Sequence, residues 1–409
     1  MLAWGAVLPA WANNAQEVLS FYKQELSAFP ATNSRESRAY AAALADNLST
    51  WARQHPQDES LADALLMKAR LHVRAQEYGD ALVTLLLLRY QFPQVPLDNL
   101  TLLFTQSLPA LDKDSREIAS RAFTAGTKAD TLQARQLDAL YQLSKLAGKA
   151  FYPAASEAFE SFFVQNTPAT SGDQVELWYG DLHRLNANYL AAISQYKKAG
   201  ALYPNSPYRA ASERLIGDIY ADNLKDTAAA TAAYTRVLQN YPDSSETGIV
   251  YKHMAILDEN NKQYDSALIN YDKAIELLGT TPASYEAYRG KADVYIKTKN
   301  FAQAYDTLQK TAILFNADEA KSTDTWLTAA QLAKRQLRSP EKYAQALEKA
   351  LLAHPESAQA PQLMFDLATT YEQLGKAKQA QETYKKLVLT YPTHKLASRA
   401  QGRLTKLAK

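Results

Sequence analysis

Residues 364–392 read MFDLATTYEQLGKAKQAQETYKKLVLTYP and form two amphipathic segments joined by a glycine. In each segment the apolar residues recur at spacings of three and four, which predicts a helix with one buried face. Gly375 marks the turn between the helices, and Pro392 ends the second one because proline lacks the N–H that a helix needs. The predicted buried face consists of Met364, Leu367, Ala368 and Tyr371 in the first helix and of Ala380, Tyr384 and Leu387 in the second.

An aromatic residue or histidine followed by proline recurs along the chain. Successive marker prolines are 37, 75, 36, 38, 113 and 37 residues apart. The two long spacings correspond to two and three units of about 37 residues, with unmarked unit ends near Asp130, Gly279 and Asn316. This register predicts about ten helix pairs. The marked ends are His55-Pro56, Phe92-Pro93, Thr167-Pro168, Tyr203-Pro204, Tyr241-Pro242, His354-Pro355 and Tyr391-Pro392.

Small residues at the helix crossing, aromatic residues in the wider gaps and a terminal proline together resemble the tetratricopeptide repeat. The resemblance covers residues 15–409, with a period near 37 instead of about 34. It implies an all-α, right-handed α–α superhelix of about ten helix pairs. The form YPxSxxxxxAxxxLxxxY is similar to repeats of bacterial envelope proteins, namely the BamD group and the group of cell-division coordinators that bind TolA.

The repeats are less regular in the N-terminal part of the chain. Between Pro93 and Asp130, Pro96 and Pro109 interrupt the pattern, which indicates either a degenerate repeat or a hinge between two arrays. The predicted organisation is residues 1–12 as a signal-peptide remnant or an apolar arm, 13–130 as less regular repeats, 131–394 as regular repeats, and 395–409 as a C-terminal capping helix.

The first twelve residues, MLAWGAVLPAWA, carry no charge and end in Ala10-Trp11-Ala12, a small-x-small pattern like a signal peptidase site. The basic n-region of a signal peptide is missing from these residues, since the first lysine is Lys23, as expected if the given start clips a longer signal peptide. Export to the periplasm and an apolar arm packed on the first repeat are the two interpretations. No apolar run is long enough for a transmembrane helix, and the most apolar one is Ala81–Leu88.

Composition and motifs exclude several kinds of site. The formal net charge of +2 offers no broad basic surface for nucleic acid. Without cysteine the chain has no disulfide, thiolate metal site or cysteine nucleophile. The motifs of phosphate-binding loops, dinucleotide sites, serine hydrolases and zinc proteases do not occur. The histidines occupy repeat positions, so we expect no metal, no cofactor and no enzyme activity. They are His55, His72, His183, His253, His354 and His394.

The resemblance implies that the first helix of each pair lines a concave groove that binds a partner. Two interpretations apply to the charged residues there: ordinary helix-surface pairs such as Arg214–Asp218 and Arg289–Asp293, or a mixed-charge peptide groove anchored by Tyr251 and Tyr288. These tyrosines also fit core positions. The candidate groove residues are Asp181, Arg184, Arg214, Asp218, Lys252, Glu259, Arg289 and Asp293.

The sequence therefore predicts a non-enzymatic scaffold or adaptor. The favoured setting is the bacterial periplasm, with envelope, secretion or cell-division proteins as partners and no nucleic acid. Two alternatives keep the same fold. One is a cytoplasmic assembly factor or regulator, and the other is a structural subunit of a larger secretion or pilus-type complex.

Overall fold

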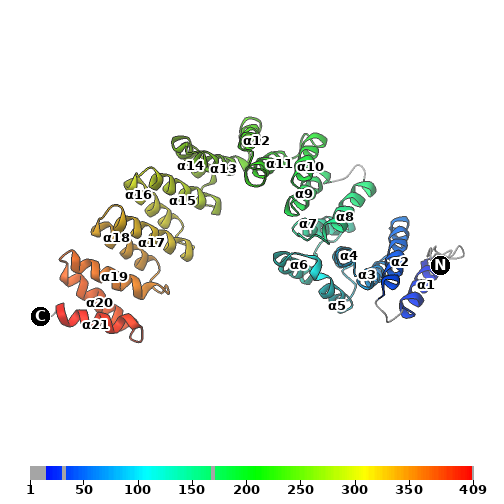
Figure 1. Cartoon of the computed structure of the whole chain (residues 1–409), viewed down its shortest axis with the longest axis horizontal. Coiled ribbons are helices and arrows are strands. Elements are labelled where there is room, and N and C mark those ends of the chain that lie inside the picture. Colours follow the sequence, from blue (N-terminus) through cyan, green and yellow to red (C-terminus); the bar gives the residue numbers. More distant parts are fainter. Residues whose placement is uncertain (1–14, 30–33, 167–170, 408–409) are drawn as a thin grey trace. The chain divides into compact units, whose positions relative to one another are not determined.

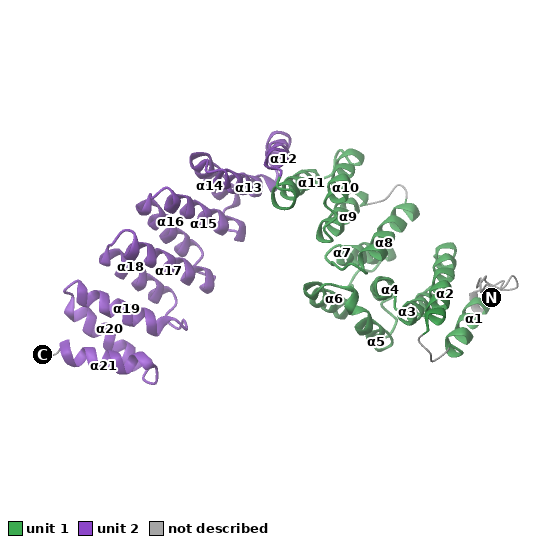
Figure 2. Cartoon of the chain, in the orientation of Figure 1, with its two compact units in different colours: residues 1–225 green, residues 226–409 purple. Residues whose placement is uncertain are grey.

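The computed structural model describes residues 15–29, 34–166 and 171–407, and all regular structure in these ranges is helical (Figure 1). The predicted leader or arm, residues 1–12, lies outside the described residues. The chain forms two compact units, residues 1–225 and 226–409 (Figure 2). No helix in the described ranges is both long and apolar enough to cross a membrane.

Unit 1 contains eleven α-helices, one short 3-10 helix and one π-helical stretch in its described part. In chain order they are α1 (Ala15–Ser27), α2 (Arg35–Gln54), α3 (Leu61–Ala75), α4 (Tyr78–Gln91), α5 (Asp98–Ser107), η1 (Leu108–Ala110), α6 (Lys113–Ala125), α7 (Leu132–Leu143), α8 (Tyr152–Gln165), α9 (Gly172–Leu185), α10 (Tyr189–Leu202), α11 (Arg209–Asp218) and the π-helical η2 (Ile219–Asn223).

Unit 2 contains ten α-helices in its described part. They are α12 (Thr227–Asn240), α13 (Glu246–Asn260), α14 (Tyr264–Leu278), α15 (Pro282–Lys297), α16 (Phe301–Leu314), α17 (Glu319–Arg335), α18 (Pro340–Ala353), α19 (Ala360–Gln373), α20 (Ala377–Thr390) and α21 (Lys395–Leu407).

The predicted unit ends coincide with the ends of the even-numbered helices α2 to α20, so the prediction of an all-α array of ten helix pairs is confirmed. The unmarked ends also match, because α6, α14 and α16 end close to Asp130, Gly279 and Asn316. Ala368, Ala380, Tyr384 and Leu387 are buried as predicted. After the tenth pair, α21 packs against α20 and α19 and buries Leu396, Ala397 and Ala400.

The turn between the two helices of a pair has the same backbone geometry in five of the pairs. Five turns place a residue in the left-handed region, with φ between 60 and 69°, seven positions after the small residue of the first helix. The next N–H then donates to a carbonyl five residues back, as from Lys376 to Tyr371 at 2.9 Å, which satisfies the last carbonyls of the helix. The five residues are Gln76, Ala187, Lys262, Lys299 and Gly375.

Helix α4 is the core helix of unit 1, and its position explains the most apolar run in the sequence. It packs against α3, α5, α7 and α8, and residues on all of its sides are buried. A helix surrounded by protein must be apolar all round. At its start the chain approaches closely: a Cβ on Gly79 would lie 1.8 Å from the carbonyl oxygen of Ala150. Only glycine therefore fits at position 79.

The division between the compact units falls between Lys225 and Asp226, just after the π-helical η2. The extra residue of this stretch shifts the left-handed residue of the turn one place later, to Lys225 with φ 57°. The irregular segment that the sequence placed between Pro93 and Asp130 forms α5, η1 and α6 within unit 1. The predicted subdivision at residue 130 stays a prediction.

The shared turn predicts the effect of exchanging glycine with other residues. Lys299→Gly should raise the free energy of unfolding by about 0.5–1 kcal/mol, because relief of left-handed strain exceeds the added entropy of the unfolded chain. Gly375→Ala should lower it by a similar amount. A Cβ at 375 would meet nothing within 4 Å, so the loss would report backbone strain alone. Urea unfolding followed by circular dichroism measures both, and changes of the opposite sign would refute the interpretation.

Candidate functional site

The eight predicted groove residues all lie on first helices, at three positions of the repeat. Relative to the small residue of each first helix they stand three before it, one after it or four after it. Asp181 and Arg184 are on α9, Arg214 and Asp218 on α11, Lys252 and Glu259 on α13, and Arg289 and Asp293 on α15. We call the face that carries these positions the first-helix surface, and describe it separately in each unit.

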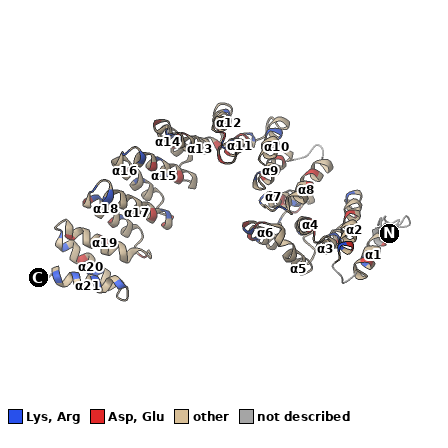
Figure 3. Ribbon diagram, in the orientation of Figure 1, with Lys and Arg blue, Asp and Glu red and all other residues tan. Residues whose placement is uncertain are grey.

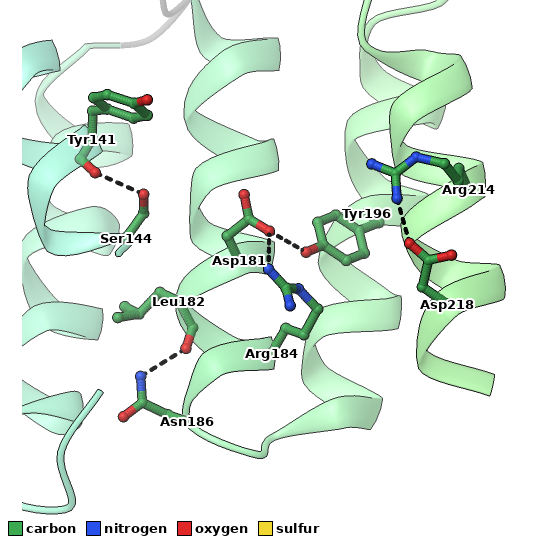
Figure 4. Close-up of polar contacts among 9 residues, drawn as sticks. All are labelled: Tyr141, Ser144, Asp181, Leu182, Arg184, Asn186, Tyr196, Arg214 and Asp218. Atoms are coloured by element: carbon green, nitrogen blue, oxygen red, sulfur yellow. Dashed lines mark hydrogen bonds and ion pairs between the residues drawn. The ribbon is translucent and has the colours of Figure 1, made fainter. Parts of the chain in front are cut away.

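In unit 1 the predicted residues bond to one another and to the core (Figure 4). Asp181 Oδ1 accepts hydrogen bonds from the Tyr196 hydroxyl at 2.8 Å and from Arg184 at 3.2 Å. Arg214 and Asp218, one turn apart on α11, form an ion pair as predicted. Burial raises the pKa of the Tyr196 hydroxyl, and the Asp181 carboxylate raises it further. The bond between Asp181 and Tyr196 joins α9 to α10, whereas the other two contacts lie within a single helix.

In unit 2 the predicted basic residues reach the next helix pair. Lys252 Nζ lies 2.5 Å from Glu286 Oε2 on α15. Arg289 lies 3.6 Å from Asp324 and donates to the Thr328 hydroxyl at 3.2 Å, both on α17. Arg289 thus turns towards the following pair and not towards Asp293 on its own helix.

These contacts recur at one position of the repeat. Lys252 and Glu286 are 34 residues apart, and Arg289 and Asp324 are 35 residues apart. At the end of the array the Arg399 guanidinium lies 4.8 Å from the centroid of the Phe365 ring, again 34 residues away. We call this series the inter-pair ladder, defined by Lys252–Glu286, Arg289–Asp324 and Phe365–Arg399.

Glu259 joins the first-helix surface to the core. Its carboxylate accepts a hydrogen bond from the Tyr271 hydroxyl at 2.7 Å, and its other oxygen lies 2.5 Å from Lys297 of the next pair. Tyr251 and Tyr288, the predicted anchors, pack in the core: Tyr288 is buried, and Tyr251 packs on the cluster around Tyr271. The burial of Tyr288 and the partial burial of Tyr251 agree with the core interpretation, and a role as partner anchors stays a prediction.

A large hollow lies on the first-helix surface of unit 1, where the sequence predicted no site. Helix α3 runs between α1 and α5, and the space above it measures about 840 Å³. The sequence could have indicated Arg70 as a groove residue. Arg70 directly follows the small residue Ala69, just as the predicted groove residue Asp181 follows Gly180. The lining residues are Lys23, Leu26, Ser27, Asp63, Leu66, Met67, Arg70, Val73, Arg74, Leu102, Leu103 and Gln106.

A second hollow on the first-helix surface lies over α7 and α9. The rings of Tyr141 and Trp178 meet there at 5.1 Å between centroids, and Lys145 Nζ lies 3.4 Å from the centroid of Tyr141. Leu137 and Gln174 complete its lining with other residues of the two helices. Exposed aromatic faces of this kind suit peptide side chains.

A third hollow, a cleft of about 300 Å³, has α4 as its floor and α2, α3, α7 and α8 as its walls. Arg53 and Glu157 form an ion pair at 3.5 Å between two of these walls. Burial lowers the pKa of the Lys68 ammonium and raises the pKa of the Asp80 carboxyl, both of which line the cleft. Its charges are of mixed sign, so it does not favour one ligand charge.

The described residues include no group of three histidines and carboxylates arranged to hold a metal ion. His72 Nδ1 lies 2.9 Å from Glu77, and His183 Nδ1 lies 2.8 Å from the Tyr152 hydroxyl. Both rings are buried, and each stands three residues after the small residue of its helix, as the buried Tyr371 does. Burial lowers the pKa of His183, so the neutral ring is the form that fits the core.

Charges of both signs are spread over each unit, and α21 is rich in basic residues (Figure 3). The ladder and the tyrosine contacts use four of the eight predicted groove charges within the protein, and Arg184, Arg214 and Asp218 form further ion pairs on their own helices. The hollow over α1, α3 and α5 differs, because it combines exposed cations with the exposed Leu102 and with partly buried leucines. Of the hollows described here, it has the clearest chemical preference.

Comparison with known sequences gives two matches to one repeat model. Residues 215–244 and 362–394 match a model described as tetratricopeptide repeat. The first segment runs from within α11 to just after α12 and the second from within α19 to just before α21, so both matches follow the predicted register. No curated protein matches the chain.

Solved structures with partial similarity include three helical-repeat proteins. PilW, a type IV pilus biogenesis factor, is 16% identical, with 57% of this chain and 100% of that chain covered and a TM-score of 0.34. A tetratricopeptide repeat protein from Parabacteroides merdae ATCC 43184 is 14% identical, with 68% and 99% covered and a TM-score of 0.38. The C-terminal part of a repeat protein from Cytophaga hutchinsonii is 16% identical, with 67% and 98% covered and a TM-score of 0.43.

The inter-pair ladder predicts a charge-swap result. Lys252→Glu should lower the free energy of unfolding by about 1 kcal/mol, because it places two carboxylates side by side. Glu286→Lys added to it should restore at least half of this loss. A double-mutant cycle by urea unfolding of the full chain gives the coupling energy. Strictly additive effects of the two changes would show that the contact does not stabilise the stacking.

Proposed function

Because the chain is a tetratricopeptide-repeat protein, we propose that it is a non-catalytic scaffold that binds other proteins through its first-helix surface. The observation that carries the proposal is the hollow over α1, α3 and α5. Leu102 is 66% exposed there, on a helix that buries Leu100 and Phe104 and leaves Leu103 partly exposed. Leu102 adjoins Leu26, Leu66 and Leu103 in the lining of the hollow, and a contiguous apolar patch of this kind is typical of a binding surface.

The helix pairs separate binding from folding. Core positions on the inner sides of the helices are filled by alanine, leucine and tyrosine, and the contacts of the inter-pair ladder join successive pairs of unit 2. Residues at the remaining first-helix positions can change without loss of the fold. A scaffold needs this property, since its partner is selected by a few side chains on a rigid support.

The proposed setting is the bacterial periplasm, and the proposed partners are envelope, secretion or cell-division proteins. The support is in the sequence: the uncharged segment Met1–Ala12 ends in Ala10-Trp11-Ala12, and the repeat form is similar to that of envelope proteins. Export would place the first-helix surface among periplasmic domains and peptides.

Site-specific photocrosslinking tests the scaffold function. A benzophenone amino acid at Leu102, in the hollow, should give adducts with other proteins in cells of the source organism. The control is Leu190 on α10, a second helix, where the side chain is similarly exposed at 73%. Adducts at Leu190 but not at Leu102 would refute binding through the first-helix surface.

N-terminal sequencing of the native protein tests the periplasmic setting. Cleavage after Ala12 should give a mature protein that begins at Asn13, recovered in the periplasmic fraction. An intact Met1 on protein recovered with the cytoplasm would refute export and leave the binding function to be tested separately.

A further inference from the structure

The side chains that line the hollow over α1, α3 and α5 carry a net positive charge. Three of its lining residues are basic, Lys23 on α1 and Arg70 and Arg74 on α3, whereas Asp63 is the one acidic residue in its lining. All four are exposed. The net positive charge of the lining therefore favours an anionic ligand.

The basic residues of the hollow differ from those of the inter-pair ladder. In the described part of the chain, Lys23 and Arg70 have no ion-pair partner within 4.0 Å, and Arg74 contacts the ring of Phe29 at 5.7 Å. Arg70 and Arg74 are one turn apart on α3, an arrangement in which like charges repel by about 0.2–0.5 kcal/mol. A bound carboxylate would remove this repulsion, and each guanidinium can hold it with two hydrogen bonds.

The same hollow offers apolar contacts around the cations. Leu66 and Val73 on α3 alternate with the arginines, Leu26 projects from α1, and Leu102 and Leu103 come from α5. A purely ionic ligand would leave these side chains in water. A ligand with apolar groups next to its carboxylates would cover both kinds of residue.

We infer that this hollow binds an acidic, leucine-rich peptide segment, in which Asp or Glu side chains flank large aliphatic ones. The inference rests on the proposed function and specifies the partner chemistry. A volume of about 840 Å³ lies within the range of about 300–1,000 Å³ typical of ligand clefts, so it accommodates a short segment. Carboxylates would meet Lys23, Arg70 and Arg74, and the aliphatic side chains would lie on Leu66 and Leu102.

Peptide titration tests the inference with the full-length protein. The probe is a short fluorescein-labelled peptide of alternating leucine and glutamate, and its binding is followed by fluorescence anisotropy. Two matched peptides carry lysine in place of glutamate or alanine in place of leucine. The acidic leucine peptide should bind at least tenfold more tightly than either, and its affinity should fall as salt is raised because exposed charges are screened.

Variants localise the binding to the hollow. Arg70→Gln with Arg74→Gln should weaken the acidic peptide about tenfold or more, and Leu102→Ala should weaken it severalfold. The control is Arg121→Gln on α6, a largely exposed arginine outside the hollow, which should bind as the unchanged chain does. Circular dichroism establishes that each variant is folded.

Three outcomes would overturn the inference: equal binding of the acidic and basic peptides, an unchanged affinity in the double arginine variant, or binding to vesicles of anionic phospholipid without binding to the peptide. Crosslinks at Leu102 together with any of these results would leave the scaffold function standing and reject the acidic-peptide chemistry alone.

Discussion

Close approach of helices at small residues is the constraint on which the array depends. Tyr271 on α14 is almost completely buried, and its ring packs against Gly290 of the next pair. A Cβ at position 290 would lie 2.3 Å from the Tyr271 hydroxyl oxygen. Each pair thus leaves a space that a large side chain of its neighbour fills. A single pair would expose both apolar sides, so stability requires neighbours, and α21 covers the last exposed side.

The fold was predictable because this constraint repeats. Proline and small residues return in register, and ten unit ends could be located without any knowledge of contacts. The turns were less visible. Gly375 indicated its turn, but Gln76, Lys262 and Lys299 adopt the same left-handed conformation without a glycine. The hydrogen bonds that end the first helix stabilise this conformation, and they are set by the whole turn and not by one residue type.

The binding surface was predictable only in part. The sequence identified the first-helix positions that lie outside the core. It could not show which charged side chains at these positions form ion pairs within the protein. Arg289 is the clearest case: four residues before Asp293, it still turns to Asp324 on another pair. Contacts of this kind depend on how successive pairs stack. The hollow around Arg70 was missed although Ala69 aligns with the small residues of later repeats, because the sequence does not show that α1, α3 and α5 leave a space between them.

Charges on such a surface divide by whether the fold already uses them. Lys252 and Arg289 each form an ion pair with the next helix pair. A ligand that binds either side chain must first break that contact. Arg70 and Arg74 line a hollow and form no ion pair within the described residues, so a carboxylate bound there breaks no ion pair and competes only with the contact of Arg74 on the Phe29 ring. Affinity depends on this difference, because only the surplus over lost interactions appears as binding free energy. Equivalent positions of a repeat array carry cations in several helix pairs. The helix pairs whose cations form no ion pair with a neighbouring helix pair are therefore the ones suited to bind an anionic partner.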